Sequence, residues 1–164
     1  MGDRNRTSLQ LLMRTPLPSI TNQKKLMYRP TRSQVLSLYN TINEHIFNNR
    51  LSRPNIDVAS HCRKYWGVCY GYYKPKKNNS YCEIRLMDKW YCIQWLITVL
   101  AHEMVHQYQW DIHSAKREKK GYNPIMSHGP SFRAFKRKLE RYGIPLKTSH
   151  SRKKWFDTQD ILKC

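Results

Sequence analysis

The sequence predicts an α+β domain formed by a helix, a small three-stranded sheet and two further helices. Three patterns lead to this fold class. Apolar residues recur at helical spacing after residue 30, short alternating runs follow after residue 55, and helical spacing returns after residue 88. A chain of 164 residues, 40% of them hydrophobic, is sufficient for one compact domain with its own core. We expect this domain to cover residues 31–146.

Two basic segments flank the predicted domain. Residues 1–30 contain six lysines and arginines against one acid, Asp3, and prolines interrupt them. No apolar periodicity is sustained there, so we expect a basic arm that is extended when free. Residues 147–164 are predicted to form a basic tail, in which Trp155 and Phe156 can fold back on the domain.

The first predicted helix begins at Thr31 or Ser33, which are both typical N-cap residues. It is expected to end near Asn48 and Asn49, before Pro54. Its apolar residues recur every three or four positions, namely Val35, Leu38, Tyr39, Ile42 and Ile46.

Three short strands are predicted next, at residues 56–59, 65–73 and 81–87. In these runs β-branched and aromatic residues alternate with small or polar residues. The segment 74–80 is rich in proline, lysine, asparagine and serine, which is typical of a turn between the last two strands.

Two helices are predicted in the second half of the chain. Asp88 is the expected N-cap of a helix from about Lys89 to Trp110. The last helix begins at Pro130, a favoured first position, and ends at Gly143. The longer helix has a predicted buried stripe that consists of Ile93, Leu96, Ile97, Leu100 and Met104.

The charge balance predicts an anionic partner. Thirty lysines and arginines against 11 acids give a formal net charge of +19. We expect nucleic acid as the partner class, with a basic surface that only confers solubility as the alternative. The candidate contact residues lie in the loop before the last helix and on that helix, namely Lys116, Arg117, Lys119, Lys120, Arg133, Lys136, Arg137 and Arg141.

Aromatic residues around the second predicted strand are a further candidate for nucleic-acid contacts. Unpaired bases stack on such side chains, particularly beside lysines. The alternative, which the frequency of aromatic residues in strands favours, is that they pack the sheet against the helices. The aromatic residues are Tyr65, Trp66, Tyr70, Tyr72 and Tyr73, and the lysines are Lys74, Lys76 and Lys77.

The sequence favours a protein of a reducing compartment without a membrane segment. The most apolar segment, 93–101, is too short for a membrane span, and the N-terminus has no signal-peptide core. The five cysteines are odd in number and never form a Cys-x-x-Cys pair, so we expect reduced core thiols and an intracellular location in the cytoplasm, nucleoid or nucleus. The less favoured alternative is a second metal site at Cys62, Cys69, Cys82 and Cys92.

The chemistry is predicted at residues 102–106, which have the pattern His-Glu-x-x-His. His102 and His106 are one helical turn apart on the same face, so both imidazoles can bind one metal ion. At about 100° per residue they lie opposite the apolar stripe, so we expect them to point away from the main core contact. Glu103 lies beside them and can reach a water at the metal without being a ligand. The alternative is a pair of ordinary core histidines.

A catalytic zinc ion usually has a third protein ligand. The metzincin continuation is absent, because Ile112 stands where its third histidine is required. His128 is the favoured candidate, because it directly precedes a predicted helix start, and His113 and Asp111 are the alternatives. The candidates for stabilising an oxyanion are Tyr108, Tyr122 and His113.

These motifs together resemble the SprT-like, or Spartan-type, zinc metalloprotease domain. The resemblance covers about residues 31–143, and its specific parts are the histidine motifs at 102–106 and 128–132. It implies a minimal zincin-like fold with one Zn²⁺ per chain on His102, His106 and His128. It also implies Glu103 as the general base and, as substrates, proteins that are crosslinked or bound to DNA, with DNA as a frequent activator.

The sequence departs from many members of this family, which carry a zinc ribbon or another DNA-binding module after the protease domain. Here no paired cysteines exist, so nucleic-acid binding would depend on the basic segments. The alternative function is a catalytically silent or structural nucleic-acid-binding protein on the same zinc scaffold. Because small basic chains of this type also occur in viral genomes, this alternative includes assembly partners and a location in a virion.

Overall fold

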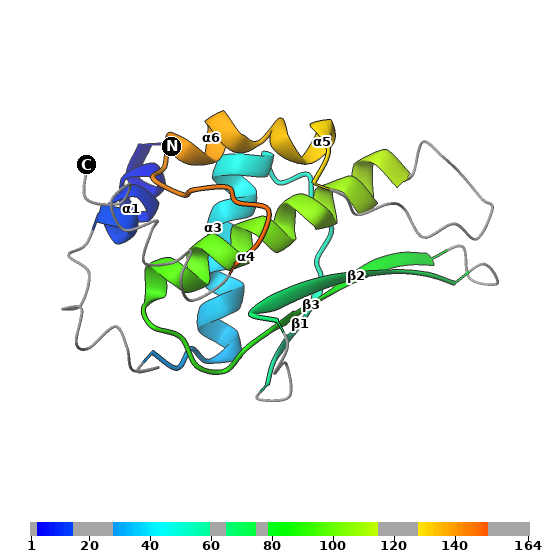
Figure 1. Ribbon diagram of the computed structural model, residues 1–164, viewed down its shortest axis with the longest axis horizontal. Coiled ribbons are helices and arrows are strands. Elements are labelled where there is room, and N and C mark those ends of the chain that lie inside the picture. Colours follow the sequence, from blue (N-terminus) through cyan, green and yellow to red (C-terminus); the bar gives the residue numbers. More distant parts are fainter. Residues whose placement is uncertain (1–2, 15–27, 60–64, 75–78, 115–127, 151–164) are drawn as a thin grey trace.

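The structure of the protein, a computed structural model, describes residues 3–14, 28–59, 65–74, 79–114 and 128–150 (Figure 1). These residues form a mixed domain in which helices pack against a three-stranded sheet, which confirms the predicted fold class. Helix α4 (Ile93–Tyr108) is central and lies between the sheet and the later helices in Figure 1. None of the described helices is long and apolar enough to cross a membrane.

Helix α3 (Arg32–Phe47) begins at one of its two predicted caps. The Thr31 hydroxyl accepts a hydrogen bond from the Gln34 N–H at 3.2 Å, and the Gln34 side-chain oxygen accepts one from the Thr31 N–H at 2.8 Å. This reciprocal pair satisfies two amides that the first turn leaves free. Asn48 and Asn49 then adopt left-handed backbone angles and end the helix, as predicted.

The sheet consists of β1 (Asn55–Val58), β2 (Gly67–Lys74) and β3 (Asn79–Leu86), in the order β1-β3-β2. β1 is parallel to β3 and β2 is antiparallel to it, so β2 is an edge strand. Gly71 lets the sheet closely approach the segment that follows α4. A Cβ atom at Gly71 would lie 2.2 Å from the Trp110 ring, so no larger residue fits there without a rearrangement.

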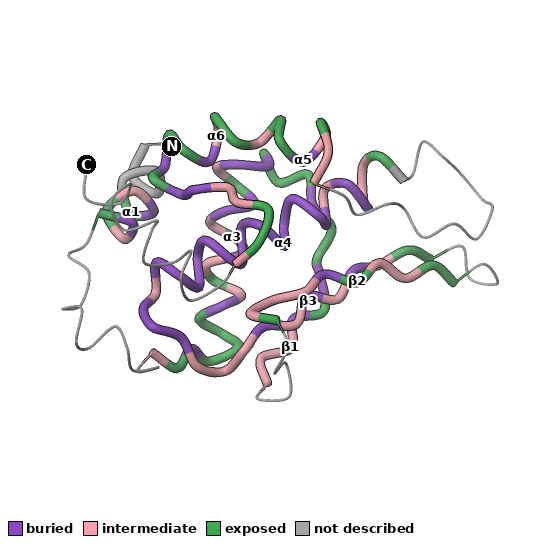
Figure 2. The backbone as a smooth tube through the Cα atoms, in the orientation of Figure 1, coloured by how far each residue is buried: buried purple, intermediate pink, exposed green. Residues whose placement is uncertain are grey.

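Helix α4 begins at Ile93 and not at about Lys89, so Asp88 is not its N-cap. Trp90 pairs with Tyr28 through two backbone hydrogen bonds of 3.0 and 2.9 Å, and this bridge holds the preceding chain outside the helix. After Tyr108 the chain continues as a π-helical segment, η2 (Gln109–Ser114). Residues 94–107 are all buried (Figure 2), so α4 is enclosed on every side.

The last predicted helix is divided into α5 (Pro130–Arg133) and α6 (Lys136–Glu140). The Phe135 N–H bonds to the Phe132 carbonyl oxygen at 3.3 Å, three residues back instead of four, and this tighter turn separates the two helices. Pro130 occupies the first turn, as predicted. Gly143 follows the helical region with a left-handed φ of 75°.

The predicted extended arm is partly helical, since residues Asp3–Arg14 form helix α1. Leu9 and Met13 are one turn apart and buried in the core, and the Gln10 amide donates to the Arg141 carbonyl oxygen at 3.0 Å. Two buried apolar residues give too weak a periodicity to predict this helix, because contacts with distant elements stabilise it. Residues 15–27 and 151–164 lie outside the described residues, so the division into arm, domain and tail stays a prediction.

Candidate metal centre

Three histidines come together on one side of α4. His102 and His106 are one turn apart on this helix, and His128 precedes α5 by two residues. The Nε2 atoms of His106 and His128 lie 3.1 and 3.2 Å from Nε2 of His102. One ligand atom from each ring lies within 4.8 Å of the others, so this cluster has the geometry to bind a metal ion.

The second nitrogen of two of these rings is held by an acceptor. Nδ1 of His102 lies 2.8 Å from the Lys147 carbonyl oxygen, and Nδ1 of His106 lies 2.9 Å from the Gln109 side-chain oxygen. Carbonyl oxygens only accept hydrogen bonds, so each Nδ1 carries the proton. The two Nε2 atoms then have only lone pairs, which repel each other at 3.1 Å. A cation between them removes this repulsion, so the donor set fits a metal bound by neutral imidazoles.

Burial keeps these imidazoles neutral. His102 and His106 are only 5% and 7% exposed. The pKa of His102 is lowered to about 2, chiefly by burial and then by the nearby rings of His150 and His106, whose protonated forms would repel it. Burial also lowers the pKa values of His106 and His128. The neutral ring is the form that binds metals, so binding at neutral pH displaces no proton from it.

His102 and His106 lie opposite the predicted apolar stripe in sequence and are nevertheless buried, because a second layer covers this face of α4. Phe132 of α5 is 1% exposed and packs against all three imidazoles. Its ring centroid lies 4.8, 5.0 and 4.7 Å from those of His102, His106 and His128. Lys147 and His150 also reach this face: the Lys147 carbonyl oxygen accepts a hydrogen bond from His102 Nδ1, and the His150 ring packs against His102.

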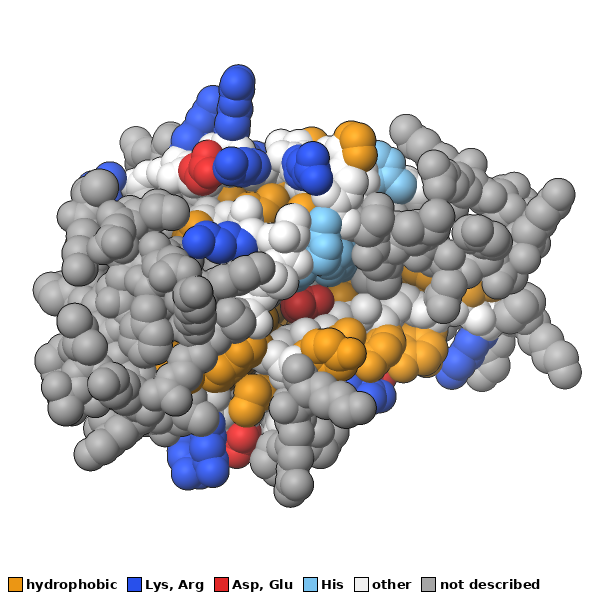
Figure 3. Space-filling view, viewed as in Figure 1, with side chains coloured by type: hydrophobic (Ala, Val, Ile, Leu, Met, Phe, Trp, Pro, Cys, Tyr) orange, Lys and Arg blue, Asp and Glu red, His pale blue; other side chains and the backbone are white. Residues whose placement is uncertain are grey.

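Glu103 lies beside the histidines, against strand β2. Its carboxylate accepts a hydrogen bond from the backbone N–H of Cys69, and burial nevertheless raises its pKa to about 8. Gly67 makes room for it, since a Cβ atom there would lie 3.2 Å from Glu103 Cγ. Figure 3 shows an acidic side chain next to histidine side chains in a hollow between the upper helices and the sheet.

Asp111, an alternative third ligand, belongs to a different network. Its carboxylate accepts hydrogen bonds from the Ser52 N–H and hydroxyl, both at 2.9 Å, and from the Gln107 amide at 3.1 Å. The Tyr39 hydroxyl donates to the Gln107 side-chain oxygen at 3.0 Å. This network joins the end of α4 to α3 and to the segment after it.

His113, the other alternative, is exposed and packs against the Tyr108 ring. The Tyr108 hydroxyl accepts a hydrogen bond from Arg50 at 3.0 Å. Neither His113 nor Tyr108 belongs to the histidine cluster. Tyr122, the third candidate for stabilising an oxyanion, lies outside the described residues.

The cysteines of the described residues are core residues. Cys69, Cys82 and Cys92 are buried free thiols, as predicted. Within the described part of the chain these three do not form a group with metal-ligand geometry. Cys62 and Cys164 lie outside it.

The candidate nucleic-acid residues fall into two sets. Lys116, Arg117, Lys119 and Lys120 lie outside the described residues. The side chains of Arg133, Lys136, Arg137 and Arg141 are all exposed on α5, α6 and the turn after them. Lysine and arginine side chains gather along this upper edge in Figure 3.

The aromatic residues of the second strand have two environments. Trp66 takes part in the core, where it packs against Trp90, Tyr91 and Trp95. Tyr70 and Tyr72 lie on the sheet face away from the helices, opposite to Cys69 and Gly71. The packing interpretation therefore holds for the tryptophan and not for these tyrosines.

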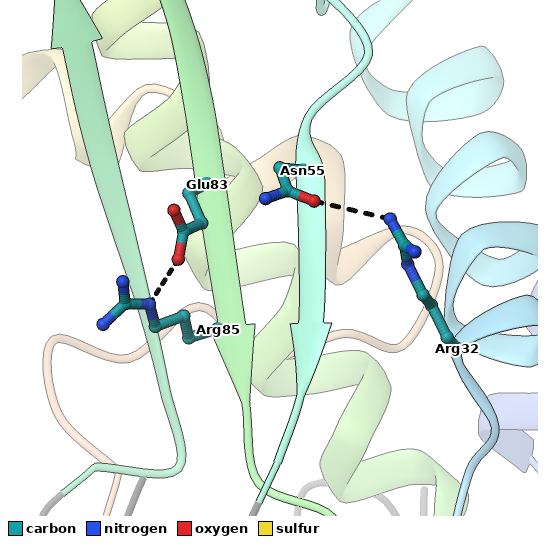
Figure 4. A network of polar contacts seen from close by, with 4 residues as sticks. All are labelled: Arg32, Asn55, Glu83 and Arg85. Carbon is teal, nitrogen blue, oxygen red and sulfur yellow. Dashed lines mark hydrogen bonds and ion pairs between the residues drawn. The ribbon is translucent and has the colours of Figure 1, made fainter. Parts of the chain in front are cut away.

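Charged residues surround the tyrosines on this outer sheet face. The Arg85 guanidinium lies 5.0 Å from the Tyr70 ring centroid and pairs with Glu83. Figure 4 shows this pair on β3, with Arg32 reaching Asn55 of β1 at 3.4 Å. Cations and anions both occur on this face, whereas Glu140 is the one acidic residue of α5 and α6.

Sequence reasoning missed three contributors to the site. Gln109 and the Lys147 carbonyl hold two of the imidazoles, and the His150 ring packs against His102 at 4.7 Å between centroids. The signal for Gln109 was its position three residues after His106, which places both on one helix face. No local pattern connects residues 147–150 with His102, because the chain folds back over 45 residues.

The fold, the His-Glu-x-x-His helix and the histidine cluster define a small zincin-like domain of the metalloprotease type. The chain matches the model of the SprT-like family over residues 35–150, and it therefore belongs to the SprT-like family. This confirms the resemblance found in the sequence. A comparison with curated proteins found no match.

Proposed function

We propose that this protein is a zinc metalloendopeptidase that hydrolyses peptide bonds of proteins. The observation that carries the proposal is the convergence of three neutral imidazoles beside the buried carboxylate of Glu103. Three histidines are a typical ligand set of catalytic zinc, which leaves a coordination position for water or substrate. His102, His106 and His128 would hold one Zn²⁺ per chain.

The residues of the proposed site have distinct tasks. Zinc at the histidines would act as a Lewis acid and polarise the scissile carbonyl. The charge of zinc would favour the ionised form of Glu103, whose carboxylate oxygen accepts a proton from the attacking water and then gives it to the nitrogen of the leaving amine. The Cys69 N–H holds this carboxylate in place through its hydrogen bond.

The edge position of β2 supports an extended peptide as the substrate. In the described sheet β2 pairs only with β3, so backbone groups on its other side can pair with a peptide strand. Because Cys69 of β2 contacts Glu103, such a peptide would pass beside the general base.

We further propose that the substrates are proteins associated with nucleic acid in a reducing compartment. The net charge of +19 supports binding to a polyanion, and the exposed basic residues of α5 and α6 provide a surface for it. The buried free thiols support the proposal of a reducing compartment, because thiols stay unoxidised there.

Binding of a single-stranded oligonucleotide should weaken steeply as the salt concentration rises. Replacing Arg133 and Arg137 by alanine should lower the affinity and reduce the slope of log affinity against log salt by about 1.4, because each lost phosphate contact removes about 0.7. The matched control replaces Arg32 and Arg53, which are also exposed and carry the same charge. If both double substitutions changed the affinity and the salt slope equally, α5 and α6 would not be the specific binding surface.

The zinc content tests the metal site directly. Elemental analysis of purified protein should give one zinc per chain, and dialysis against a mild chelator should remove it far more readily from His128→Ala, which lacks one of the three ligands. His113→Ala is the control and should retain zinc like the wild type. No zinc in the wild type, even after refolding with the metal, would refute the proposed enzyme.

A further inference from the structure

Gln109 links the two segments that carry the histidines. It directly follows α4, is 3% exposed, and comes three residues after His106. Its side-chain oxygen lies 2.9 Å from His106 Nδ1, and its amide nitrogen donates to the Ser131 hydroxyl at 2.8 Å. Ser131 belongs to α5, three residues after His128. One buried side chain therefore connects the helix of the first two histidines with the helix after the third.

We propose that Gln109 is a positioning residue of the metal centre. Its oxygen accepts the proton of His106 Nδ1 and so holds this ring in the tautomer that directs the Nε2 lone pair toward His102. Its bond to Ser131 restrains the amide and the spacing between α4 and α5. This inference rests on the proposed metal site and deepens it, because it assigns a residue that sets the geometry without touching the metal.

The hydrogen-bond acceptors that hold His102 and His106 are of two kinds, a main-chain carbonyl and a side chain. His102 is held by a main-chain carbonyl oxygen, that of Lys147, which a side-chain substitution does not remove. His106 is held by a side chain, so a single substitution at Gln109 abolishes its support. Such outer partners of ligating histidines fix the ring orientation and its basicity, and they contribute to metal affinity.

The test uses three variants of the full chain and the metal alone as probe. Gln109→Leu removes both hydrogen bonds at nearly constant volume, whereas Gln109→Glu keeps an acceptor for His106. Gln94→Leu is the matched control, since it removes a different buried glutamine, which lies on α4 and outside the histidine cluster. Competition with a chromophoric chelator gives the zinc affinity, and the visible spectrum of the Co²⁺-loaded protein reports the coordination geometry.

We expect Gln109→Leu to weaken zinc binding by about 10- to 100-fold and to change the Co²⁺ spectrum. Gln109→Glu should recover most of the affinity, and Gln94→Leu should match the wild type. Unchanged zinc affinity and spectrum in Gln109→Leu, with zinc lost from His106→Ala, would overturn the positioning role alone. A wild type that binds no zinc would overturn the metal site as well.

A measurement on the wild type keeps the inference testable if Gln109→Leu does not fold. Nitrogen NMR shifts of the His106 ring in the metal-free protein should place its proton on Nδ1. A proton on Nε2 would overturn the positioning role, because Gln109 would then not select the tautomer that binds metal.

Discussion

Glu103→Gln should abolish peptide-bond hydrolysis while the protein keeps its zinc. The amide has nearly the shape of the carboxyl group and can still accept the hydrogen bond from the Cys69 N–H, so the local fold is preserved. It cannot accept a proton at neutral pH, and the loss of a general base lowers the rate by about 10²- to 10⁴-fold. Cleavage of labelled casein and of a histone, each with and without single-stranded DNA, measures the activity.

The control for this variant is Glu83→Gln, which changes a half-buried glutamate on the outer sheet face. It should cleave at the wild-type rate. Wild-type cleavage by Glu103→Gln would show that Glu103 is not the base. Zinc-loaded wild type that binds nucleic acid but cleaves neither substrate would favour the structural nucleic-acid-binding function.

Phe132→Ala should strongly lower the free energy of unfolding and should also weaken zinc binding. Its ring is buried against all three imidazoles, so truncation leaves a cavity at the metal centre. Replacing a buried phenylalanine by alanine costs about 3–5 kcal/mol of unfolding free energy. Urea denaturation of the metal-free protein gives the stability, and chelator competition gives the zinc affinity.

Phe135→Ala is the control that distinguishes a general loss of packing from an effect on zinc binding. Phe135 is half-buried between α5 and α6 and packs against Phe47 and Tyr108 at centroid distances of 4.9 and 4.7 Å. This variant should lose some stability and keep its zinc affinity. If Phe132→Ala and Phe135→Ala had the same zinc affinity, the contact of Phe132 with the imidazoles would not contribute to zinc binding.

The parts of the fold that local chemistry determines could be predicted from the sequence. The Thr31 cap, the alternating strands and the histidines four residues apart each depend on neighbours within one or two turns. The structure also brings His128 close to His102 and His106, and Pro130 indicated a helix start directly after this histidine.

The parts that the sequence did not predict depend on distant contacts. Helix α1 is held by two core residues, and the late start of α4 follows from the pairing of Trp90 with Tyr28, 62 positions earlier by residue number. The burial of the histidines has the same origin, because Phe132, Lys147 and His150 lie against them. A periodic pattern reports which face of a helix is apolar, and it does not report what covers the polar face.

With the proposed zinc site, the enclosure of α4 on every side would couple the amount of folded protein to its metal supply. Polar side chains inside such a helix cost stability unless a partner compensates them, so the metal-free domain would be the less stable form. A metal that binds only the folded chain adds stability in proportion to the logarithm of its concentration. Scarce zinc would thus shorten the lifetime of each molecule, because proteases degrade the transiently opened form, and it would reduce abundance together with activity.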